Sequence, residues 1–337
     1  MNYIEPPHIE EEVWNNPNAA FNEKALALFN YQYQHNALYA AYCRALHIRD
    51  TDVHTIEQIP FLPISFFKSH RVVSGNWPVQ LYFESSGTTG TQNSRHWIKD
   101  VAIYKKSFTL GFEQFYCRPQ QYCIIGLLPS YLQQGHSSLV YMVNELISIS
   151  GVQGSGFYLD EWDALQQQIQ YNEKHHIPTL LIGVTYALLH FAEQYPQPLK
   201  NTIVMETGGM KGRRKEITRE EVHAILQKQW QLDAIHSEYG MTELLSQAYS
   251  SGKGIFFPTA TMKVLIRATD DPFDVAAQPP QNKASINGAI NIIDLANIYS
   301  CAFIATEDLG RLYTNSSFEP MGRIDNSDIR GCSLLAL

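Results

Sequence analysis

The sequence predicts an α/β fold in which a largely parallel sheet is covered by helices on both faces. From about residue 101 to residue 232, short apolar runs typical of buried strands alternate with runs that have helical spacing. Such alternation is typical of parallel strands connected by helices. We expect strands at 122–128, 179–184 and 202–207, and helices at 101–116, 137–149, 185–194 and 218–232.

The two ends of the chain have different patterns. Residues 18–47 carry Ala, Leu and aromatic residues at helical spacing, which predicts one or two helices. The prolines in 59–64 predict an extended connector. After about residue 245, short apolar runs (255–257, 261–267, 289–294, 299–304) are divided by turn residues, which favours strands. We therefore expect a helical N-terminal segment (1–60), an α/β core that binds nucleotide and acyl group (61–245) and a β-rich subdomain (246–337).

Composition sets broad limits on function. The 337 residues are 45% hydrophobic and 17% charged, an ordinary balance for a globular protein. The net charge of −8, with one short basic cluster at 211–215, argues against non-specific nucleic-acid binding. No signal peptide is recognised and no apolar run approaches the length of a membrane span. Five cysteines without Cys-x-x-Cys or metal-ligand spacing favour free thiols in the cytoplasm.

A run of seven Gly, Ser and Thr residues follows the strand-like residues 79–83. Small residues let the backbone approach a ligand, and their hydroxyl and N–H groups can surround phosphate oxygens. No Gly-Lys-Ser/Thr follows, so the run is not a Walker-type loop. By itself it is equally compatible with a flexible surface loop. Its residues are Ser85, Ser86, Gly87, Thr88, Thr89, Gly90 and Thr91.

Three further motifs follow in order. They are Glu238-Tyr239-Gly240-Met241-Thr242-Glu243, then Thr306-Glu307-Asp308-Leu309-Gly310-Arg311, then Gly322-Arg323-Ile324-Asp325. With these four motifs, the chain resembles the adenylate-forming superfamily of acyl-CoA synthetases, luciferases and peptide-synthetase adenylation domains over roughly residues 60–331. The resemblance implies the large N-terminal domain of those enzymes, with stacked α/β subdomains and a small β-rich subdomain. It also implies ATP and Mg²⁺, because these enzymes join a carboxylate to the α-phosphate of ATP.

The resemblance assigns a role to each motif. Ser85 to Thr91 would hold phosphates, Glu243 would bind magnesium, and Thr242 would bond the α-phosphate. Tyr239, followed by Gly240, would stack on adenine, Asp308 would accept the ribose hydroxyls, and Arg323 would lie beside the ribose or phosphates. Gly208 and Gly209 would contact adenine, and His136 would lie near the carboxylate pocket. Considered singly, Glu243 also suits a helix N-terminus, Tyr239 a core position, Asp308 a turn and His136 the surface.

The end of the chain departs from the larger superfamily. Only twelve residues, without lysine, follow Asp325, so the mobile C-terminal domain that supplies a lysine is expected to be absent. A short branch, the acyl-protein synthetases of the fatty-acid reductase of luminous bacteria, resembles this chain also at 66–68 and 128–132. These enzymes load the acyl group on a cysteine near their C-terminus, where this chain has Cys332. An apolar-like role for Cys332 in a terminal strand is equally compatible. Lys68 is a candidate replacement for the missing lysine, or a surface residue.

The sequence thus predicts a ligase that activates a long-chain fatty acid as acyl-adenylate and transfers it to a protein cysteine thiol. The acyl chain is expected in an apolar pocket from the 120–145 region, and an acyl reductase subunit is a candidate acceptor. One alternative is an acyl- or aryl-CoA ligase relative that delivers to CoA or a carrier protein. Another is a non-catalytic nucleotide-binding protein. A serine hydrolase is disfavoured because no Gly-x-Ser-x-Gly motif occurs.

Overall fold

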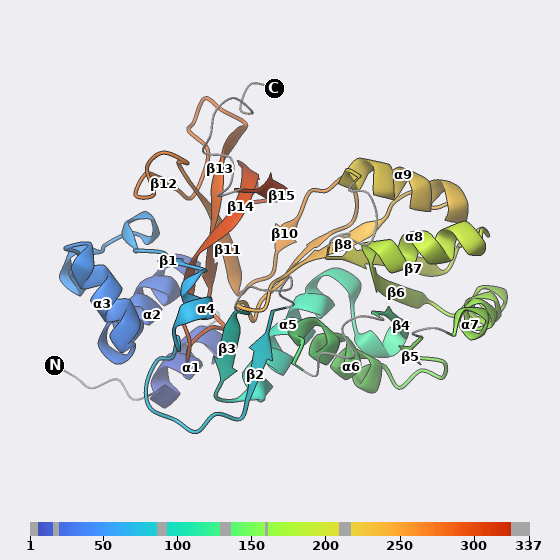
Figure 1. Cartoon of the computed structure of the whole chain (residues 1–337), viewed down its shortest axis with the longest axis horizontal. Coiled ribbons are helices and arrows are strands. Elements are labelled where there is room, and N and C mark those ends of the chain that lie inside the picture. Colours follow the sequence, from blue (N-terminus) through green and yellow to red (C-terminus); the bar gives the residue numbers. More distant parts are fainter. Residues whose placement is uncertain are drawn as a thin grey trace.

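The computed structural model describes residues 6–15, 20–85, 93–128, 136–158, 161–208 and 217–324. Within them the strands form a seven-stranded sheet, a six-stranded sheet and a two-stranded hairpin (Figure 1). The larger sheet has the order β10-β9-β8-β7-β6-β4-β5, and the smaller has the order β1-β14-β13-β11-β12 with β15 paired to β14. The predicted α/β class is confirmed.

The seven-stranded sheet is parallel through most of its width. The parallel strands are β4 (Cys123–Leu127), β5 (Gly156–Phe157), β6 (Thr179–Val184), β7 (Thr202–Thr207) and β8 (His236–Tyr239). Strand β9 (Ala248–Ser250) pairs antiparallel with β8, and β10 (Phe257–Pro258) pairs antiparallel with β9. Helices α8 (Thr185–Gln194) and α9 (Arg219–Trp230) lie on one face, and α5 (Val101–Tyr116) and α6 (Ser138–Ser150) on the other (Figure 1). Because both faces are covered, β4 and β6 are buried at every residue.

Local sequence signals fix several of these elements. Strands β6 and β7 and helix α8 begin and end at the predicted residues. Helix α9 starts with a capping box, in which Thr218 Oγ1 accepts from the Glu221 N–H at 3.2 Å and Glu221 Oε2 accepts from the Thr218 N–H at 2.8 Å. Helix α7 (Trp162–Lys174) packs Trp162 against Phe191 of α8.

The six-stranded sheet consists of short edge strands and long central ones. Its members are β1 (Leu62–Pro63), β11 (Met262–Arg267), β12 (Val275–Ala276), β13 (Ser285–Asp294), β14 (Phe303–Tyr313) and β15 (Phe318–Arg323). The strand expected at 299–304 starts only at Phe303. The backbone before it is bound by a side chain of another element, because Gln32 Nε2 donates to Asn297 O at 2.7 Å and Gln32 Oε1 accepts from Ala302 N at 2.9 Å.

The N-terminal helices pack against this smaller sheet. Helices α1 (Pro6–Asn15), α2 (Phe21–His35) and α3 (Ala37–Ala45) lie beside it (Figure 1). The predicted helical stretch is two helices, divided at Asn36, whose side chain caps α3 by accepting from Tyr39 N at 3.0 Å. The rings of Phe29, Tyr39 and Phe61 surround Phe303 of β14. The division into domains at residues 60 and 245 stays a prediction. Strands β9 and β10, which follow residue 245, extend the seven-stranded sheet next to β8.

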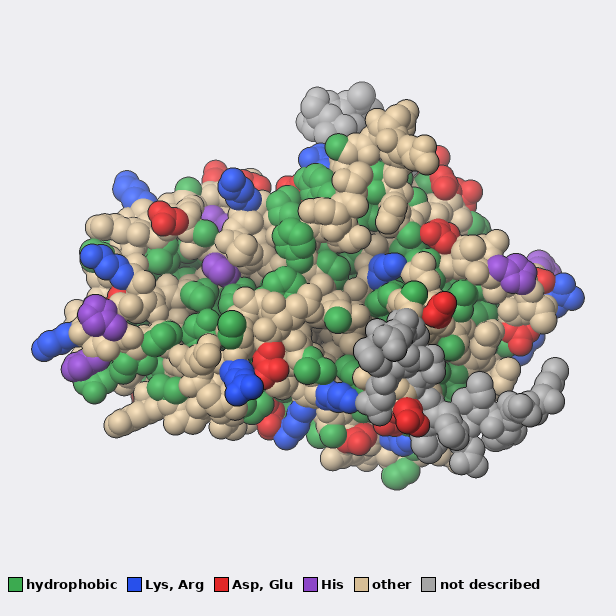
Figure 2. All heavy atoms as spheres, turned by 180° about the vertical axis from the view of Figure 1, so that it is seen from behind, with side chains coloured by type: hydrophobic (Ala, Val, Ile, Leu, Met, Phe, Trp, Pro, Cys, Tyr) green, Lys and Arg blue, Asp and Glu red, His purple; other side chains and the backbone are tan. Residues whose placement is uncertain are grey.

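Strands β2 (Leu81–Glu84) and β3 (Arg95–Ile98) pair in antiparallel orientation, and the Ser/Gly/Thr run lies between them in the sequence. Short helix α4 (Phe66–Ser69) contacts β3 through the Phe67 and His96 rings. Seen from behind, the described surface shows Lys, Arg, Asp and Glu side chains interspersed, without one continuous patch of a single charge (Figure 2). No helix in the described ranges combines the length and apolar character needed to cross a membrane.

Candidate active site

Three residues from separate motifs meet where the carboxyl end of β8 faces β14 and β15. The Tyr239 hydroxyl donates to Asp308 Oδ2 at 2.7 Å. Arg323 lies opposite Asp308 in the β14–β15 register, and its Nε is 3.5 Å from Asp308 Oδ1. The Arg323 side chain is 76% exposed, so this ion pair adds little to stability. The fold therefore places an aromatic ring, a carboxylate and a guanidinium at one point between the two sheets.

The environment of Tyr239 keeps its phenol neutral. Its ring packs edge-on against Phe318 at 5.3 Å between centroids, with Phe256 at 6.0 Å. Burial, and then the nearby Asp308 carboxylate, raise the pKa of Tyr239. The hydroxyl is consequently a hydrogen-bond donor to Asp308. Asp308 is itself held by its backbone, since Thr306 Oγ1 accepts from Asp308 N at 3.1 Å.

Glu243 is a buried carboxylate close to two cations. Its exposed fraction is 5%. Burial raises its pKa, while a hydrogen bond from Ser94 and the charges of Lys68 and Arg323 act in the opposite direction. The candidate lysine of α4 is thus close enough to Glu243 to affect its ionisation. A carboxylate with so little water around it is suited to an additional positive charge.

The base of the Ser/Gly/Thr run is tied to the same place. The Ser85 N–H donates to Ser94 O at 3.0 Å, and the Ser94 N–H donates to Ser85 Oγ at 2.9 Å. Two residues after Ser94, His96 Nδ1 is 2.9 Å from Thr242 O. A carbonyl oxygen only accepts, so this nitrogen carries the proton. Both motifs are therefore hydrogen-bonded to the same segment, 94–96: Ser85 to Ser94 and Thr242 to His96.

The backbone after Glu243 is fixed by β13 and the turn that follows it. Asp294, fully buried, accepts from Leu245 N at 2.7 Å, and from Ser246 N at 3.0 Å and Ser246 Oγ at 2.6 Å. Asn297 Nδ2 donates to Glu243 O at 2.8 Å. These bonds hold Glu243 at a fixed height above the sheet edge. The sequence analysis missed Asp294 and Asn297, although an acidic residue at the end of the apolar run 289–294 is a usable signal.

Two further buried carboxylates lie at the ends of β7 and β8. Burial opposes ionisation of Glu206, but hydrogen bonding to His223 and the charge of Arg219 outweigh it, so that its pKa is lowered. Arg219 Nε is 3.5 Å from Glu206 Oε1. Glu238 accepts from Thr207 Oγ1 at 2.6 Å and has no cationic partner within the described ranges, and burial raises its pKa to about 7.

Gly240 is explained by its neighbour Glu238. A Cβ at Gly240 would lie 2.4 Å from Glu238 Oε1, closer than real Cβ contacts allow. Gly208 has φ +73° just after β7, and its carbonyl accepts from Thr185 Oγ1 at 2.8 Å. Packing therefore explains the glycine at position 240, and backbone conformation explains the glycine at position 208. The contacts of both glycines with nucleotide stay predictions.

His136 is exposed and stacks on Tyr82 with ring centroids 4.1 Å apart. Its carbonyl accepts from Glu84 N at 2.9 Å, which places it beside the start of the Ser/Gly/Thr run. None of the contacts found for the described residues joins it to Thr242 or Glu243. The predicted residues that lie outside the described ranges are Ser86, Gly87, Thr88, Thr89, Gly90, Thr91, Gly209 and Cys332.

The backbone fold is that of adenylate-forming enzymes. A 2-hydroxyisobutyryl-CoA ligase in the postadenylation state aligns with a TM-score of 0.56 and 10% identity, over 96% of this chain and 73% of that one. An ATP-bound RpMatB-BxBclM chimera aligns with a TM-score of 0.55 and 14% identity, over 73% of this chain and 48% of that one. MatB of Rhodopseudomonas palustris, also ATP-bound, gives 0.53 and 14% over the same shares. The chain thus spans about half the length of the chimera and of MatB. The fold class is the large N-terminal domain of the adenylate-forming superfamily.

Comparison of the sequence with protein families identifies the family of the chain. The model of the family "Acyl-protein synthetase, LuxE" matches residues 11–336, and the chain belongs to this family. A long-chain-fatty-acid–luciferin-component ligase of Photorhabdus luminescens is 36% identical over 69 residues, which are 20% of this chain and 59% of that protein. The predicted resemblance to acyl-protein synthetases is confirmed.

Proposed function

We propose that the protein is an ATP-dependent ligase that activates a long-chain fatty acid as acyl-adenylate and passes the acyl group to a protein cysteine. The observation that carries the proposal is the meeting of Tyr239, Asp308 and Arg323 beside the buried Glu243. Family membership and the printed name of the Photorhabdus luminescens relative support the substrate class.

In this proposal the nucleotide lies along the edge where β8 meets β14. The Tyr239 ring offers a flat apolar face to adenine, and the Asp308 carboxylate accepts from ribose hydroxyls. Asp308 Oδ2 already accepts from Tyr239 in the present structure, so ribose binding uses its remaining lone pairs or replaces that bond. Arg323, mostly exposed beside Asp308, has donors to spare for ribose or phosphate.

The residues around Glu243 fit a magnesium ion. Glu243 is a buried carboxylate whose pKa burial has raised, and a divalent cation would favour its charged form. Magnesium is usually held by one or two carboxylates together with substrate phosphates, rather than by a protein cage. The described residues contain no group of three or more His, Cys, Asp or Glu side chains that could hold a metal. When bound, the ion would neutralise charge between Glu243 and the phosphates.

The adenylation step brings two anions together. A carboxylate oxygen of the fatty acid attacks the α-phosphorus of ATP, the bond from that phosphorus to the bridging oxygen of the β-phosphate breaks, and pyrophosphate leaves. In the proposal, the Thr242 hydroxyl donates to an α-phosphate oxygen, and the hydrogen bond between His96 and the Thr242 carbonyl supports this role by fixing the backbone. Lys68 and Arg323, whose charges act on Glu243, contribute positive charge.

We assign the transfer step to Cys332. Its thiolate attacks the carbonyl carbon of the acyl-adenylate, a thioester forms, and AMP leaves. Of the cysteines in the described ranges, Cys43, Cys123 and Cys301 are buried with raised pKa, and Cys117 is exposed at the end of α5. Cys332 follows Ile324 by eight residues, which extended span at most about 28 Å. That reach covers the distance from the ribose site to an adjacent α-phosphate.

The first experiment measures ATP–pyrophosphate exchange with a panel of fatty and aromatic acids. We expect exchange with long-chain acids in the wild type and its loss in Glu243→Ala. The matched control is Glu113→Ala, which removes an exposed carboxylate from α5. Normal exchange in Glu243→Ala would remove Glu243 from the metal role, and ATP binding without exchange for any acid would favour a non-catalytic nucleotide-binding protein.

The second experiment follows the acyl group. With ATP and a radiolabelled fatty acid, the wild type is expected to acquire a label that hydroxylamine releases. Cys332→Ser is expected to lose the label and keep exchange, whereas the control Cys117→Ser keeps both. Labelling of Cys332→Ser at the wild-type level would contradict the assignment, and AMP release that depends on CoA would favour a CoA ligase.

A further inference from the structure

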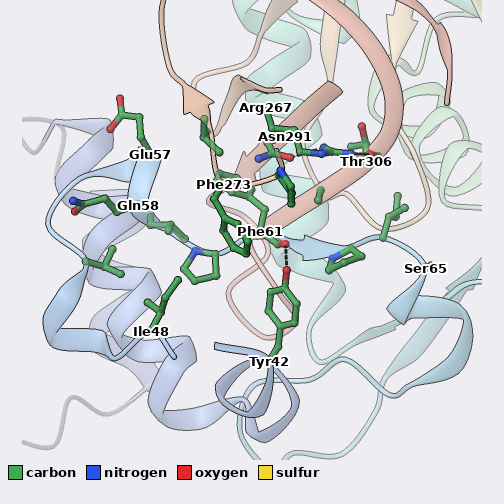
Figure 3. A pocket seen from close by; sticks show the side chains of 18 of the residues that line it. Tyr42, Ile48, Glu57, Gln58, Phe61, Ser65, Arg267, Phe273, Asn291 and Thr306 are labelled. Carbon is green, nitrogen blue, oxygen red and sulfur yellow. Dashed lines mark hydrogen bonds between the residues drawn. The ribbon is translucent and has the colours of Figure 1, made fainter. Parts of the chain in front are cut away.

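A cavity of about 590 Å³ lies between the N-terminal segment and the six-stranded sheet (Figure 3), and three residues of the two C-terminal motifs, Thr306, Glu307 and Ile324, are among those that line it. Its walls come from α3 and residues 48–65 on one side and from β11 to β14 on the other. Neither Tyr239, Thr242 nor Glu243 lines it. Most of its lining is apolar, including Ile48, Val53, Ile59, Phe61, Ile64 and Phe273. Its volume is within the range of small-molecule sites.

Arg267 brings a positive charge to one end of this cavity. Its Nη1 donates to Ile290 O at 2.8 Å and to Asn291 Oδ1 at 2.6 Å, and its Nη2 donates to Thr306 O at 2.6 Å. Two N–H groups on neighbouring nitrogens, one on Nε and one on Nη2, have no acceptor among the described residues. Nor does any carboxylate of the described chain form an ion pair with Arg267. Burial lowers its pKa, which indicates that the guanidinium has lost part of its hydration without a counter-charge.

Asn291 supplies a second unpartnered donor beside it. This residue lines the cavity and is 0% exposed, and its Nδ2 has no hydrogen-bond acceptor among the described residues. Buried donors are nearly always paired in folded proteins, so an unpaired one next to a partly dehydrated cation indicates a missing acceptor. Figure 3 shows Arg267, Asn291 and Thr306 together at the end of the cavity away from Tyr42.

The charge balance of the lining decides between kinds of anion. Arg267 is the only Lys or Arg among the described lining residues, whereas Asp52, Glu57 and Glu307 are acidic. A phosphate dianion would have one cation and three carboxylates around it. A single carboxylate matches the two free N–H groups of one guanidinium.

We propose that this cavity binds a monocarboxylate with an aliphatic body, a free fatty acid, with its carboxylate on Arg267 and its chain along the apolar wall. The site includes none of Tyr239, Thr242 and Glu243, and the proposal does not depend on the proposed reaction. It is linked to the ribose carboxylate through one residue: Thr306 O accepts from Arg267, and Thr306 Oγ1 accepts from Asp308 N.

Calorimetric titration of the full chain with decanoate, without ATP and magnesium, tests the proposal. Decanoate is expected to bind, and decanol and decyl phosphate to bind more weakly. Arg267→Gln should weaken decanoate binding by about tenfold to a hundredfold, the effect of losing a hydrogen-bonded charge partner. Because Arg267 also bonds three protein oxygens, a second variant is needed. Phe273→Asp adds a negative charge at a lining side chain that is 57% exposed, and should weaken decanoate by a similar factor.

The control for that variant is Phe257→Asp, at a 39% exposed phenylalanine of β10 that does not line the cavity. A decanoate analogue with a photoreactive diazirine, followed by peptide mass spectrometry, locates the site. Labelling of peptides within 48–65 or 267–276, lost in Phe273→Asp and kept in Phe257→Asp, supports the proposal. Three results would overturn the proposal: equal affinity for decanol, tighter binding of decyl phosphate, or labelling confined to peptides around 239–243. None of these results bears on pyrophosphate exchange.

Discussion

Replacing Glu238 by glutamine should change how stability depends on pH. Glu238 is buried at the carboxyl end of β8, and burial raises its pKa from 4.5 to about 7. In the unfolded chain the group ionises near its ordinary value, so between pH 4.5 and 7 the folded state holds a proton that the unfolded state has lost. The stability of the wild type therefore falls as the pH rises through this window, and levels off above pH 7.

The size of the effect follows from the shift. A displacement from 4.5 to about 7 corresponds to about 3 kcal/mol of unfolding free energy, lost between the two pKa values. Glutamine is neutral throughout, and its carbonyl oxygen can still accept from Thr207, which lies 2.6 Å from Glu238 Oε2. The extra amide N–H groups of the introduced glutamine cost the same at every pH. The difference in stability between variant and wild type should thus grow by about 3 kcal/mol from about pH 4 to about pH 8 in favour of the variant.

Urea unfolding followed by tryptophan fluorescence, at a series of pH values, measures this difference, since Trp230 is fully buried. Glu113→Gln, at an exposed position on α5, is the control for loss of one carboxylate. If the curves of Glu238→Gln and wild type run parallel across this pH range, the buried carboxylate titrates alike in both states and the reasoning is refuted. If the stability difference between Glu113→Gln and the wild type also grew with pH, the effect would be assigned to the change in net charge.

Three further substitutions test the site. Tyr239→Phe keeps the ring and removes the donor to Asp308, and should lower the unfolding free energy by about 1–2 kcal/mol in urea unfolding; an unchanged value would mean that this bond is not formed in solution. Asp294→Asn turns an amide N–H₂ toward backbone donors, so it should lower the unfolding free energy by about 3 kcal/mol and reduce pyrophosphate exchange. Wild-type stability of this variant would refute the role of Asp294 in holding the backbone at 245–246. His96→Leu removes the bond to Thr242 O and should raise the KM for ATP while leaving the KM for the acid unchanged; equal changes in both would indicate general misfolding.

The elements that the sequence predicted well are those with local causes. Strands β6 and β7 are continuous apolar runs of six residues, and helix α9 opens with a capping box that two residues three positions apart create. The stretch 299–304 was predicted as strand and is only partly one. Asn297, before the stretch, and Ala302, just before β14, bond to Gln32 on a helix near the other end of the chain, and no local pattern reports such a contact.

In the candidate site, too, some residues were predicted from local sequence patterns and others were missed. Tyr239, Asp308 and Arg323 were predicted from short motifs, and the fold brings them together. His96 and Asp294 were missed because their roles depend on partners far along the chain, Thr242 for the first and Leu245 for the second. A histidine within a strand has many uses, and only its position against Thr242 identifies this one. Supporting residues of a site are thus less predictable than the residues that the ligand requires.

The site is built from two sheets, and this has a consequence for nucleotide binding. β8 supplies the aromatic ring and leads to Glu243, while β14 and β15 supply Asp308 and Arg323. The clamp by Asp294 is buried and made of protein groups alone, so it holds the two sheets in register whether or not a ligand is bound. The bond from Tyr239 to Asp308 also crosses between the sheets, but it uses an oxygen that ribose hydroxyls would need. Replacing it costs about 1–2 kcal/mol, less than two ribose hydrogen bonds to a carboxylate return. In the proposed function, the free protein therefore keeps the Asp308 carboxylate paired with Tyr239, and nucleotide binding would exchange that partner for the ribose hydroxyls.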